Sequence, residues 1–246
     1  MAGEIMVERF DFGMKRETKE DGTVVTDADL AINQLVLNLF ERDFPRIRVI
    51  SEEGGREVPE AEYAALCDPL DGTLPFSRGL PISAFCLSIL DDGQPIIAVI
   101  NDPFMKRLWY AELGKGSFLN GKKLEVSRHH DIDRSHLGVL FWPDSPFHLL
   151  EVAGVLVNRG ARVINPWTIA YLGGLVASGD LDATIFPGRN GWETAAMQLI
   201  VTEAGGFATD IEGQTIDYRP DGKIKGHVIS NGLIHQRLVD IISRCL

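Results

Sequence analysis

A run of hairpin signals between residues 82 and 127 constrains the fold more than any other feature of the sequence. The apolar segments AFCLSIL, RLWYAEL and SFLN each run into a glycine turn, respectively DDG, GKG and NG, and the segments that follow those turns are PIIAVIND, SFLN and KKLEVS. Asp-Gly and Asn-Gly turns between short apolar runs are typical of β-hairpins. This part of the chain is therefore predicted to form an antiparallel sheet.

Longer helical patterns alternate with short apolar strands after residue 135, as in an α/β arrangement. The predicted strands are HLGVLFW, ARVIN and LDATIF, and the predicted helices span about 146–158, about 168–178, a segment N-capped by Asn190 that stops at Gly205-Gly206, and a terminal segment from about Leu233. We expect a layered α/β sandwich with an N-terminal α+β domain at residues 1–128, a C-terminal α/β domain at residues 129–246, and the functional site between them.

The segment that follows Thr26 predicts an amphipathic helix. Apolar residues recur at offsets 0, 3, 4, 7 and 8 from Ile32, Thr26 and Asp29 form a Thr-x-x-Asp capping signal, and Pro45 ends the pattern. A short strand at residues 46–50 then runs into the acidic loop SEEGG, and AEYAALCDP reads as a second strand.

Composition excludes several function classes. The 246 residues carry a net charge of −11, so nucleic acid and anionic membranes, which need clustered cations, are not expected partners. The three cysteines have no paired spacing, the N-terminus lacks the apolar core of a signal peptide, and no apolar run is long enough to span a bilayer. We expect a cytoplasmic protein.

The motif DPLDGT places two aspartates at the end of a predicted buried strand. Pro69 favours extended backbone before it, which puts Asp68 at the strand end and Asp71 in the following turn, while the amides of Gly72 and Thr73 can face an anion. Taken alone, the motif is as consistent with an ordinary turn as with a metal site.

Further carboxylates stand at the ends of other predicted elements: Asp27, Glu52, Glu53 and Glu193. Each has a simpler interpretation, either as a solvated loop residue or as compensation for a helix dipole. Brought together, the carboxylates would repel one another unless cations intervened, and an all-oxygen ligand set favours magnesium.

The chain resembles the inositol monophosphatase family of magnesium-dependent, lithium-sensitive phosphatases. The resemblance covers nearly the whole length and depends on VVTDADLAIN, SEEG, DPLDGT, GKGSFLNGKKLEVS and WETAAMQLIVTEAGG, in the family's order and approximate spacing. It implies an αβαβα sandwich with an N-terminal antiparallel sheet and a C-terminal mixed α/β layer. It also implies two or three Mg²⁺ ions, inhibition by Li⁺, a homodimer and a small phosphate monoester as substrate.

The resemblance assigns roles position by position. Glu52, Asp68 and the carbonyl of Leu70 match ligands of the first magnesium, and Asp68, Asp71 and Glu193 match ligands of the second. Gly72 and Thr73 match the amides that hold the phosphate. The hydroxyl of Thr73, paired with Asp27, matches the group that orients the attacking water, and Glu52 is counted with these catalytic residues.

The chain departs from the family pattern around the leaving group. Glu193 stands where the family has aspartate, Pro75 replaces an asparagine, Phe186 replaces a glutamate that contacts inositol hydroxyls, and Trp167 and Ile169 replace a Gly-x-Ala pair. A substrate site lined by Asp71, Glu193, Trp167 and Phe186 is more apolar than an inositol site and offers a polyol fewer hydrogen bonds.

Four functions therefore remain open. The favoured one is hydrolysis of an inositol phosphate or a related sugar or alcohol phosphate. The alternatives are a 3′(2′),5′-bisphosphate nucleotidase, a histidinol phosphatase and, from another class, a metal-binding regulatory protein with weak catalysis. Two basic segments stay ambiguous between site and surface: Lys15, Arg16 and Lys19 before the first helix, and Arg189 in the loop before Glu193.

Overall fold

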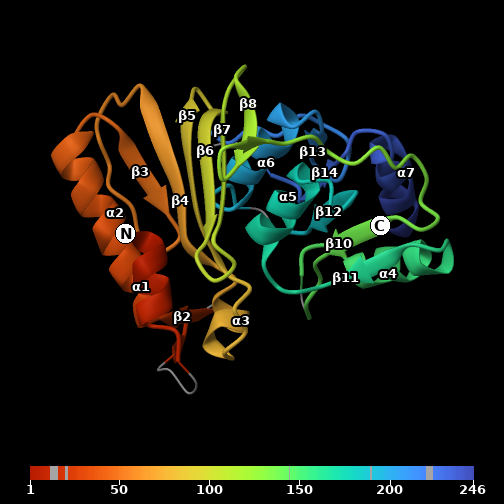
Figure 1. Ribbon diagram of the computed structural model, residues 1–246, viewed down its shortest axis with the longest axis horizontal. Helices are drawn as coiled ribbons and strands as arrows, with labels where there is room; N and C mark the ends of the chain where they lie inside the picture. The colour runs from red at the N-terminus through yellow and green to blue at the C-terminus, as the bar shows by residue number, and fades with distance from the viewer. Residues whose placement is uncertain (12–15, 20–21, 144, 189, 220–223) are drawn as a thin grey trace.

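Seven helices and three sheets make up the described part of the fold, and their main elements are stacked in five layers (Figure 1). The computed structural model describes residues 1–11, 16–19, 22–143, 145–188, 190–219 and 224–246. Helices α1 (Ala2–Glu8) and α2 (Asp27–Asp43) cover the outer face of a seven-stranded sheet. Helices α5 (Ile169–Ala177) and α6 (Thr194–Glu203) lie between this sheet and a five-stranded one, whose outer face carries α4 (Leu149–Asn158) and α7 (His235–Cys245). The predicted αβαβα sandwich is confirmed.

The seven-stranded sheet contains the predicted hairpins. Its strand order is β3-β4-β5-β6-β7-β8-β9, and every pair is antiparallel except β3 with β4. The bounds are β3 Arg48–Ser51, β4 Tyr63–Asp71, β5 Ala84–Asp91, β6 Gln94–Asp102, β7 Arg107–Glu112, β8 Gly116–Leu119 and β9 Lys122–Lys123. Beside the sheet lie the short helix α3 (Thr73–Ser77) and the ribbon of β1 (Arg16–Thr18) and β2 (Val24–Thr26).

The five-stranded sheet is mixed, as expected for a C-terminal α/β layer. Its order is β11-β10-β12-β14-β13; β10 runs parallel to both β11 and β12, and β14 runs antiparallel to both of its neighbours. The bounds are β10 His136–Val139, β11 Arg162–Ile164, β12 Ala183–Phe186, β13 Phe207–Thr209 and β14 His227–Ser230. The proposed boundary between the two domains, at residues 128 and 129, falls in the segment that joins the two sheets.

The two glycines of α5 allow it to pack tightly against its neighbours. An added Cβ at Gly173 would lie 1.9 Å from Cγ of Met197 on α6, and one at Gly174 would lie 2.7 Å from Cε2 of Trp109 on β7. Trp109 is fully buried and donates its Nε1 hydrogen to the Ser178 hydroxyl at 3.0 Å. Because both glycines lack a Cβ, α5 sits deep between the sheets, with its N-terminus facing the end of β4.

One predicted helix start is wrong. Asn190 does not cap α6; the N-cap is Glu193, and the Asn190 carbonyl instead accepts a bond from Oγ1 of Thr194 at 3.2 Å. Residues 191–193 form a turn ahead of the helix. This turn places Glu193 at the end of α6 that faces β4.

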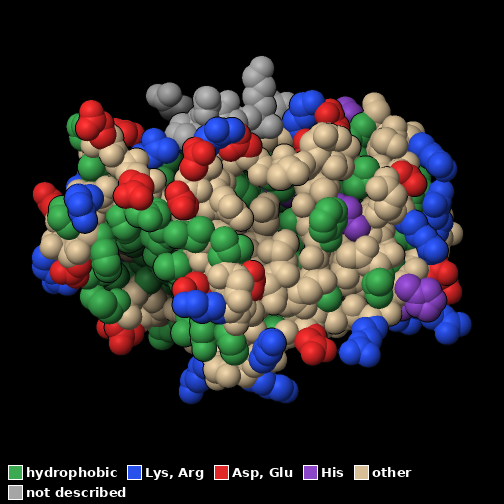
Figure 2. All heavy atoms as spheres, turned by 90° about the horizontal axis from the view of Figure 1, so that it is seen from above, with side chains coloured by type: hydrophobic (Ala, Val, Ile, Leu, Met, Phe, Trp, Pro, Cys, Tyr) green, Lys and Arg blue, Asp and Glu red, His purple; other side chains and the backbone are tan. Residues whose placement is uncertain are grey.

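The outer surface is charged at the end of the molecule that holds α4 and α7. Viewed from above, lysine and arginine side chains line that end, whereas hydrophobic side chains gather over the half that holds the seven-stranded sheet (Figure 2). Among the residues that the structure describes, no helix has the length and apolar character needed to cross a membrane.

His227 on β14 makes the stability of the protein depend on pH. The ring is fully buried between Phe186 and Tyr218, and neither ring nitrogen has a partner within the described part of the chain. Burial lowers the pKa of His227 to about 3. A lowered folded pKa means that stability is present above the unfolded pKa and is lost as the pH falls.

We therefore expect His227→Phe to flatten the acid side of the stability curve. Between pH 7 and pH 5 the wild type should lose about 2 kcal/mol of unfolding free energy through this residue, given an unfolded pKa of about 6.5. The variant should not lose this amount, as urea unfolding at both pH values will show. His130→Phe, which changes an exposed ring, is the matched control. Equal pH dependence in wild type and His227→Phe would contradict the assignment.

Candidate active site

Two parallel strands bring the first two carboxylates together. Ser51 at the end of β3 pairs with Cys67 on β4, so the residues that follow them, Glu52 just past β3 and Asp68 within β4, lie side by side at this edge of the sheet. The amide of Glu52 donates to the Cys67 carbonyl at 3.2 Å and extends this pairing by one residue. Parallel pairing thus makes neighbours of carboxylates that are sixteen residues apart in sequence.

A bulge interrupts the pairing of β4 with β5 within the DPLDGT motif. Asp68 pairs with Cys86 and Asp71 with Ala84, so β4 holds one residue more than β5 over this stretch. Pro69 has no amide hydrogen to donate to the ladder, and the amide of Leu70 donates to Oδ1 of Asp68 at 2.8 Å. Strand β4 therefore continues to Asp71, which the sequence had placed in the turn.

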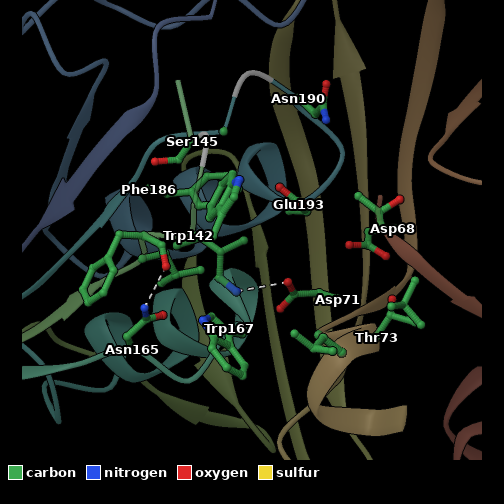
Figure 3. Close-up of a pocket in the computed structure, with 18 of the residues that line it drawn as sticks. Asp68, Asp71, Thr73, Trp142, Ser145, Asn165, Trp167, Phe186, Asn190 and Glu193 are labelled. Atoms are coloured by element: carbon green, nitrogen blue, oxygen red, sulfur yellow. Dashed lines mark hydrogen bonds between the residues drawn. The ribbon is translucent and has the colours of Figure 1, made fainter. Parts of the chain in front are cut away.

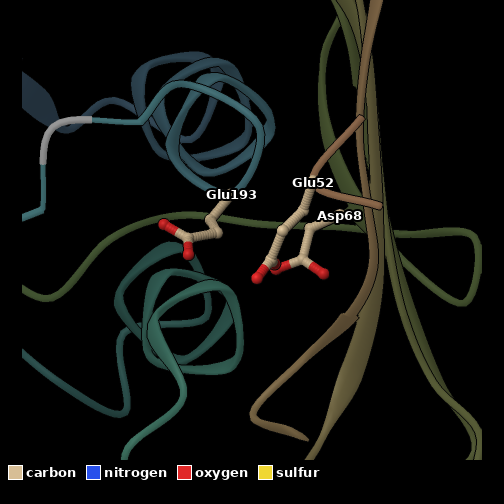
Figure 4. Close-up of side chains that lie close together, drawn as sticks. All are labelled: Glu52, Asp68 and Glu193. Atoms are coloured by element: carbon tan, nitrogen blue, oxygen red, sulfur yellow. The ribbon is translucent and has the colours of Figure 1, made fainter. Parts of the chain in front are cut away.

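Three of the predicted metal ligands meet at this edge. Glu52 and Asp68 from the sheet and Glu193 from the start of α6 each offer an oxygen, and all three oxygens lie within 4.8 Å of one another (Figure 4). The Oε2 atom of Glu193 is buried and has no hydrogen-bond partner among the described residues. A buried carboxylate oxygen without a donor is costly unless a cation occupies the site.

The electrostatics of the three carboxylates support the same conclusion. Burial raises the pKa of Asp68 well above its ordinary value, and the charges of Glu52, Asp71 and Glu193 raise it further. Burial, followed by the charges of Asp71 and Glu52, raises the pKa of Glu193 in the same way. Oxygen donors of this kind fit a hard divalent cation, which would offset the repulsion between them.

Lys19 supplies a protein cation beside these carboxylates. Its Nζ lies 3.2 Å from Oε1 of Glu52 and 2.5 Å from Oε1 of Glu53. Burial lowers the pKa of Lys19, but the bonds and charges of Glu53 and Glu52 outweigh this and leave the pKa raised. Lys19 lines the site, whereas Lys15 lies outside the described residues.

Asp71 is held differently from the other three. Its carboxylate accepts bonds from the Thr168 hydroxyl, from the amide of Ile169 at 3.0 Å and from the amide of Ala170 at 2.9 Å. It therefore caps the N-terminus of α5, a helix whose own N-cap residue Thr168 makes no side-chain cap. Asp71 lies outside the group of three. Burial raises its pKa, and the bonds from Thr168 and from the first amides of α5 oppose that rise.

The predicted pairing of Thr73 with Asp27 is wrong. Asp27 points outward and forms an ion pair with Arg9, with 2.6 Å between Oδ2 and Nη1. The Thr73 hydroxyl lies 3.0 Å from Oδ1 of Asp29 and 3.0 Å from the Leu70 carbonyl oxygen. Asp29 turns inward because its Oδ2 completes the capping box, where it accepts the amide of Thr26 at 2.8 Å.

The chain turns sharply at Gly72 between β4 and α3. Gly72 has a φ of 85°, and an added Cβ would lie 3.0 Å from Cβ of Thr168. The Ser83 hydroxyl holds the Gly72 carbonyl at 2.9 Å. This fixed turn places Gly72 and Thr73, the two predicted phosphate-binding residues, in the wall of the same cavity as the carboxylates.

These residues line a cavity of about 1190 Å³ that has two unlike sides. Asp68, Asp71, Thr73 and Glu193 lie on one side, and Trp142, Phe186 and Trp167 lie on the other (Figure 3). The structure thus places the predicted Trp167, Phe186 and Ile169 at the cavity. Arg189 lies outside the described residues.

Several residues of the cavity were not singled out from the sequence, Trp142 and Asn165 among them. Trp142 follows β10 at the end of the apolar run HLGVLFW, and Asn165 follows β11. Both stand just past the end of a parallel strand, which is where α/β sheets place binding residues. Their position after strand ends is the sequence signal that could have identified them as cavity residues.

The whole chain matches an established family. A model of the inositol monophosphatase family matches residues 1–245. The chain is 31% identical over 234 residues to the histidinol-phosphatase of Mycobacterium tuberculosis, covering 92% of this chain and 87% of that protein. It is 28% identical over 220 residues to the fructose-1,6-bisphosphatase/inositol-1-monophosphatase of Thermotoga maritima, covering 89% of this chain and 82% of that protein.

Solved structures agree with this match. The Thermotoga maritima IMPase superposes with a TM-score of 0.89 at 25% identity, covering 99% of this chain and 93% of that chain. The extragenic suppressor protein suhB of Bartonella henselae gives 0.88 at 26% identity, covering 100% of this chain and 95% of that chain. From the match over residues 1–245 and these structural likenesses, it follows that the chain belongs to the inositol monophosphatase family.

Proposed function

We propose that this chain is a magnesium-dependent phosphomonoesterase that acts on a small phosphate monoester, such as an inositol phosphate or a related sugar or alcohol phosphate. The observation that carries the proposal is the trio of Glu52, Asp68 and Glu193, whose oxygens lie within 4.8 Å of one another. The Oε2 of Glu193, which is buried and has no partner among the described residues, supports a cation at this trio. The same cavity holds the Gly72 turn.

The residues that would hold magnesium are Glu52, Asp68 and the carbonyl of Leu70 for one ion, and Asp68, Asp71 and Glu193 for a second. When bound, the ions supply charge that binds the phosphate oxygens, lower the pKa of a water and stabilise the leaving alkoxide. Glu193 has one methylene more than the aspartate of the family pattern, and it reaches the other two carboxylates from α6. Li⁺ is proposed as an inhibitor.

The chain's own groups would bind the phosphate and orient the attacking water. The amides of Gly72 and Thr73 stand at the turn into α3 and would donate to phosphate oxygens. The Thr73 hydroxyl bonds to Asp29 at 3.0 Å, which fixes the direction of its lone pairs toward a water. In this proposal Asp29 takes the role that the sequence assigned to Asp27.

Phosphate release from a panel of monoesters tests the proposal. With MgCl₂ in excess, the purified protein should hydrolyse at least one member of the panel. The same assay with excess EDTA should give no release, because without cations the carboxylates repel a phosphate. Absence of hydrolysis on every substrate, in folded protein that binds Mg²⁺, would overturn the proposal.

A second candidate is a metal-binding regulatory protein with weak catalysis. The observation that favours it is similarity to the Nus factor SuhB of Escherichia coli, which is 29% identical over 226 residues, covering 86% of this chain and 82% of that protein. Normal Mg²⁺ binding by calorimetry without turnover would select this candidate. We also propose a cytoplasmic homodimer, which sedimentation velocity and cell fractionation will test.

Gly72→Ala should lower both stability and phosphate affinity. The left-handed backbone would be strained by about 1 kcal/mol, and contact with Thr168 adds to this cost. Gly114→Ala is the matched control, because Gly114 has a similar φ of 75° but nothing within 4 Å of an added Cβ. We expect the midpoint of thermal unfolding to fall further in Gly72→Ala than in Gly114→Ala, and only Gly72→Ala to raise KM. Equal effects would mean that crowding at Gly72 is unimportant.

A further inference from the structure

The turn that carries Glu52 is held by the sheet only at its two ends. At one end the amide of Glu52 donates to the Cys67 carbonyl at 3.2 Å, and at the other the chain returns to β3, where Arg56 pairs with Val49. Residues 53–55, between these points, belong to no strand. A metal ligand on such a turn needs a further contact that keeps its carboxylate in one place.

Asn33 on α2 supplies a contact to the middle of this turn. Its Nδ2 donates to the carbonyl of Glu53 at 3.0 Å and to the carbonyl of Gly54 at 3.1 Å. One NH₂ group has two hydrogens, so a single side chain can bond two successive carbonyls. The Asn33 side chain is buried. It therefore fixes the backbone directly after Glu52 from a helix 20 residues away in the sequence.

Helix α2 is a firm support for this contact. Its apolar face packs on β3 and β4, on the outer side of the seven-stranded sheet (Figure 1). One turn before Asn33, Asp29 of the same helix accepts a bond from the Thr73 hydroxyl at 3.0 Å. Residues four apart lie on one face of a helix. One face of α2 thus bonds both to the turn of Glu52 and to the residue proposed to orient water.

Asn33 is a costly residue for the stability of the fold. Its Oδ1 is buried and has no partner in the part of the chain that the structure describes. A leucine, which branches at the same carbon, would avoid burying this atom. Glu53 is half-buried and Gly54 is exposed, so water can replace Nδ2 at their carbonyls. The position of the turn explains the asparagine better than stability does.

Glu53 is held from two directions. Asn33 bonds its carbonyl, and Nζ of Lys19 lies 2.5 Å from its Oε1. With Glu53 fixed, the carboxylate of the preceding Glu52 lies beside those of Asp68 and Glu193 (Figure 4).

We propose that Asn33 is a positioning residue, which holds the turn after β3 so that the carboxylate of Glu52 stays in the cation site. Asn33 does not line the cavity, so it acts through Glu52 and not on the substrate. This role rests on the proposed magnesium-dependent function and adds to it a residue outside the cavity.

Calorimetry with Mg²⁺ alone tests this role without turnover. Asn33→Leu and Asn33→Ala should each weaken Mg²⁺ binding by about 10- to 100-fold, the range for loss of a contact that orients a metal ligand. In the metal-free protein, amide exchange at residues 52–56 should become faster in both variants. Asn33→Leu fills the buried space and removes the unpaired oxygen, so in EDTA it should unfold at a higher temperature than Asn33→Ala. Metal affinity should therefore be lost whether or not stability is.

Asn231→Ala is the matched control. Asn231 is also a buried asparagine, and its Nδ2 donates to the His129 carbonyl at 2.7 Å, but it does not line the cavity or contact the turn of Glu52. This variant should lose stability and keep its Mg²⁺ affinity within about twofold of the wild type. Wild-type affinity in Asn33→Leu, or binding by Asn231→Ala as weak as that of the Asn33 variants, would overturn the proposal.

The dependence of hydrolysis on Mg²⁺ separates this role from the proposed function itself. On any ester that is hydrolysed, both Asn33 variants should need about 10-fold or more Mg²⁺ for half-maximal rate, whereas kcat at saturating Mg²⁺ should change less than this requirement. If no ester is hydrolysed while both variants still bind Mg²⁺ more weakly than the wild type, the phosphomonoesterase function fails and the role of Asn33 stands.

Discussion

Asp68→Asn should abolish activity, by about 10³-fold or more, and should not destabilise the metal-free protein. The carboxylate that both proposed ions share would become neutral, so the variant would bind cations poorly. The amide oxygen can still accept the Leu70 amide that bonds to Asp68 at 2.8 Å. Local structure is therefore kept while charge is removed.

The stability part of this prediction follows from the sign of the pKa shift. Burial and three neighbouring carboxylates raise the pKa of Asp68 well above its ordinary value. A raised folded pKa means that stability present below the unfolded pKa, about 3.9, is lost as the pH rises through the folded value. At pH 8 the metal-free wild type has therefore lost this part of its unfolding free energy, and Asp68→Asn, which has no charge to bury, has not.

Thermal unfolding of both proteins, with EDTA and with MgCl₂, will measure this difference. Without metal, the variant should unfold at the same temperature as the wild type or higher, and Mg²⁺ should stabilise only the wild type. Glu41→Gln, an exposed change on α2, is the control and should behave as the wild type throughout. Equal stabilisation of Asp68→Asn by Mg²⁺ would remove Asp68 from the ligand set.

The layers of the fold follow from local patterns in the sequence. Glycine turns between short apolar runs predict the hairpins of β5 to β9, and amphipathic spacing predicts α2. The carboxylates could be predicted as a group because they follow strands or precede helices, and parallel strand ends meet at one edge. Segment type and strand-end position are local properties, so one sequence is enough to reveal them.

Which aspartate pairs with Thr73, Asp27 or Asp29, depends on the direction in which each side chain leaves helix α2. Both aspartates belong to the first turn of α2, but a capping box turns the third helical residue back toward the N-cap. The Thr26-x-x-Asp29 capping signal already implied that Asp29 faces inward and Asp27 outward. The two predictions conflicted, and the local hydrogen bonds decide in favour of Asp29.

Contacts between segments that are distant in the chain could not be predicted from the sequence. Asp71 bonds to Thr168 and Ile169, which are 97 and 98 residues away, because α5 is wedged between the sheets by its glycines. No local pattern near DPLDGT predicts that its second aspartate caps a helix. The same holds for Trp142, whose position in the cavity depends on the packing of β10 against β11 and β12.

Asp71→Ala should lower stability as well as activity, in contrast to Asp68→Asn. Removal of the carboxylate leaves the amides of Ile169 and Ala170 at the buried start of α5 without an acceptor. Unsatisfied buried donors cost about 1–3 kcal/mol each, so the loss should be about 2–4 kcal/mol after relaxation. For a chain of this size that corresponds to a fall of roughly 5–15 °C in the midpoint of thermal unfolding.

Asp71→Asn separates the two roles of this carboxylate. Its amide oxygen can still accept a backbone amide of α5, and its NH₂ group can donate to the Thr168 hydroxyl, so stability should fall by only about 1 kcal/mol. Activity should be lost as completely as in Asp71→Ala, because a neutral amide does not balance a cation. Near-normal turnover in Asp71→Asn would show that Asp71 is only a helix cap, and wild-type stability in Asp71→Ala would show that the cap contributes nothing. Burial raises the pKa of both aspartates, but Asp68→Asn keeps the one backbone bond that Asp68 accepts, whereas Asp71→Ala removes the acceptor of three bonds. These two substitutions in one motif should therefore change the stability of the metal-free protein in opposite directions.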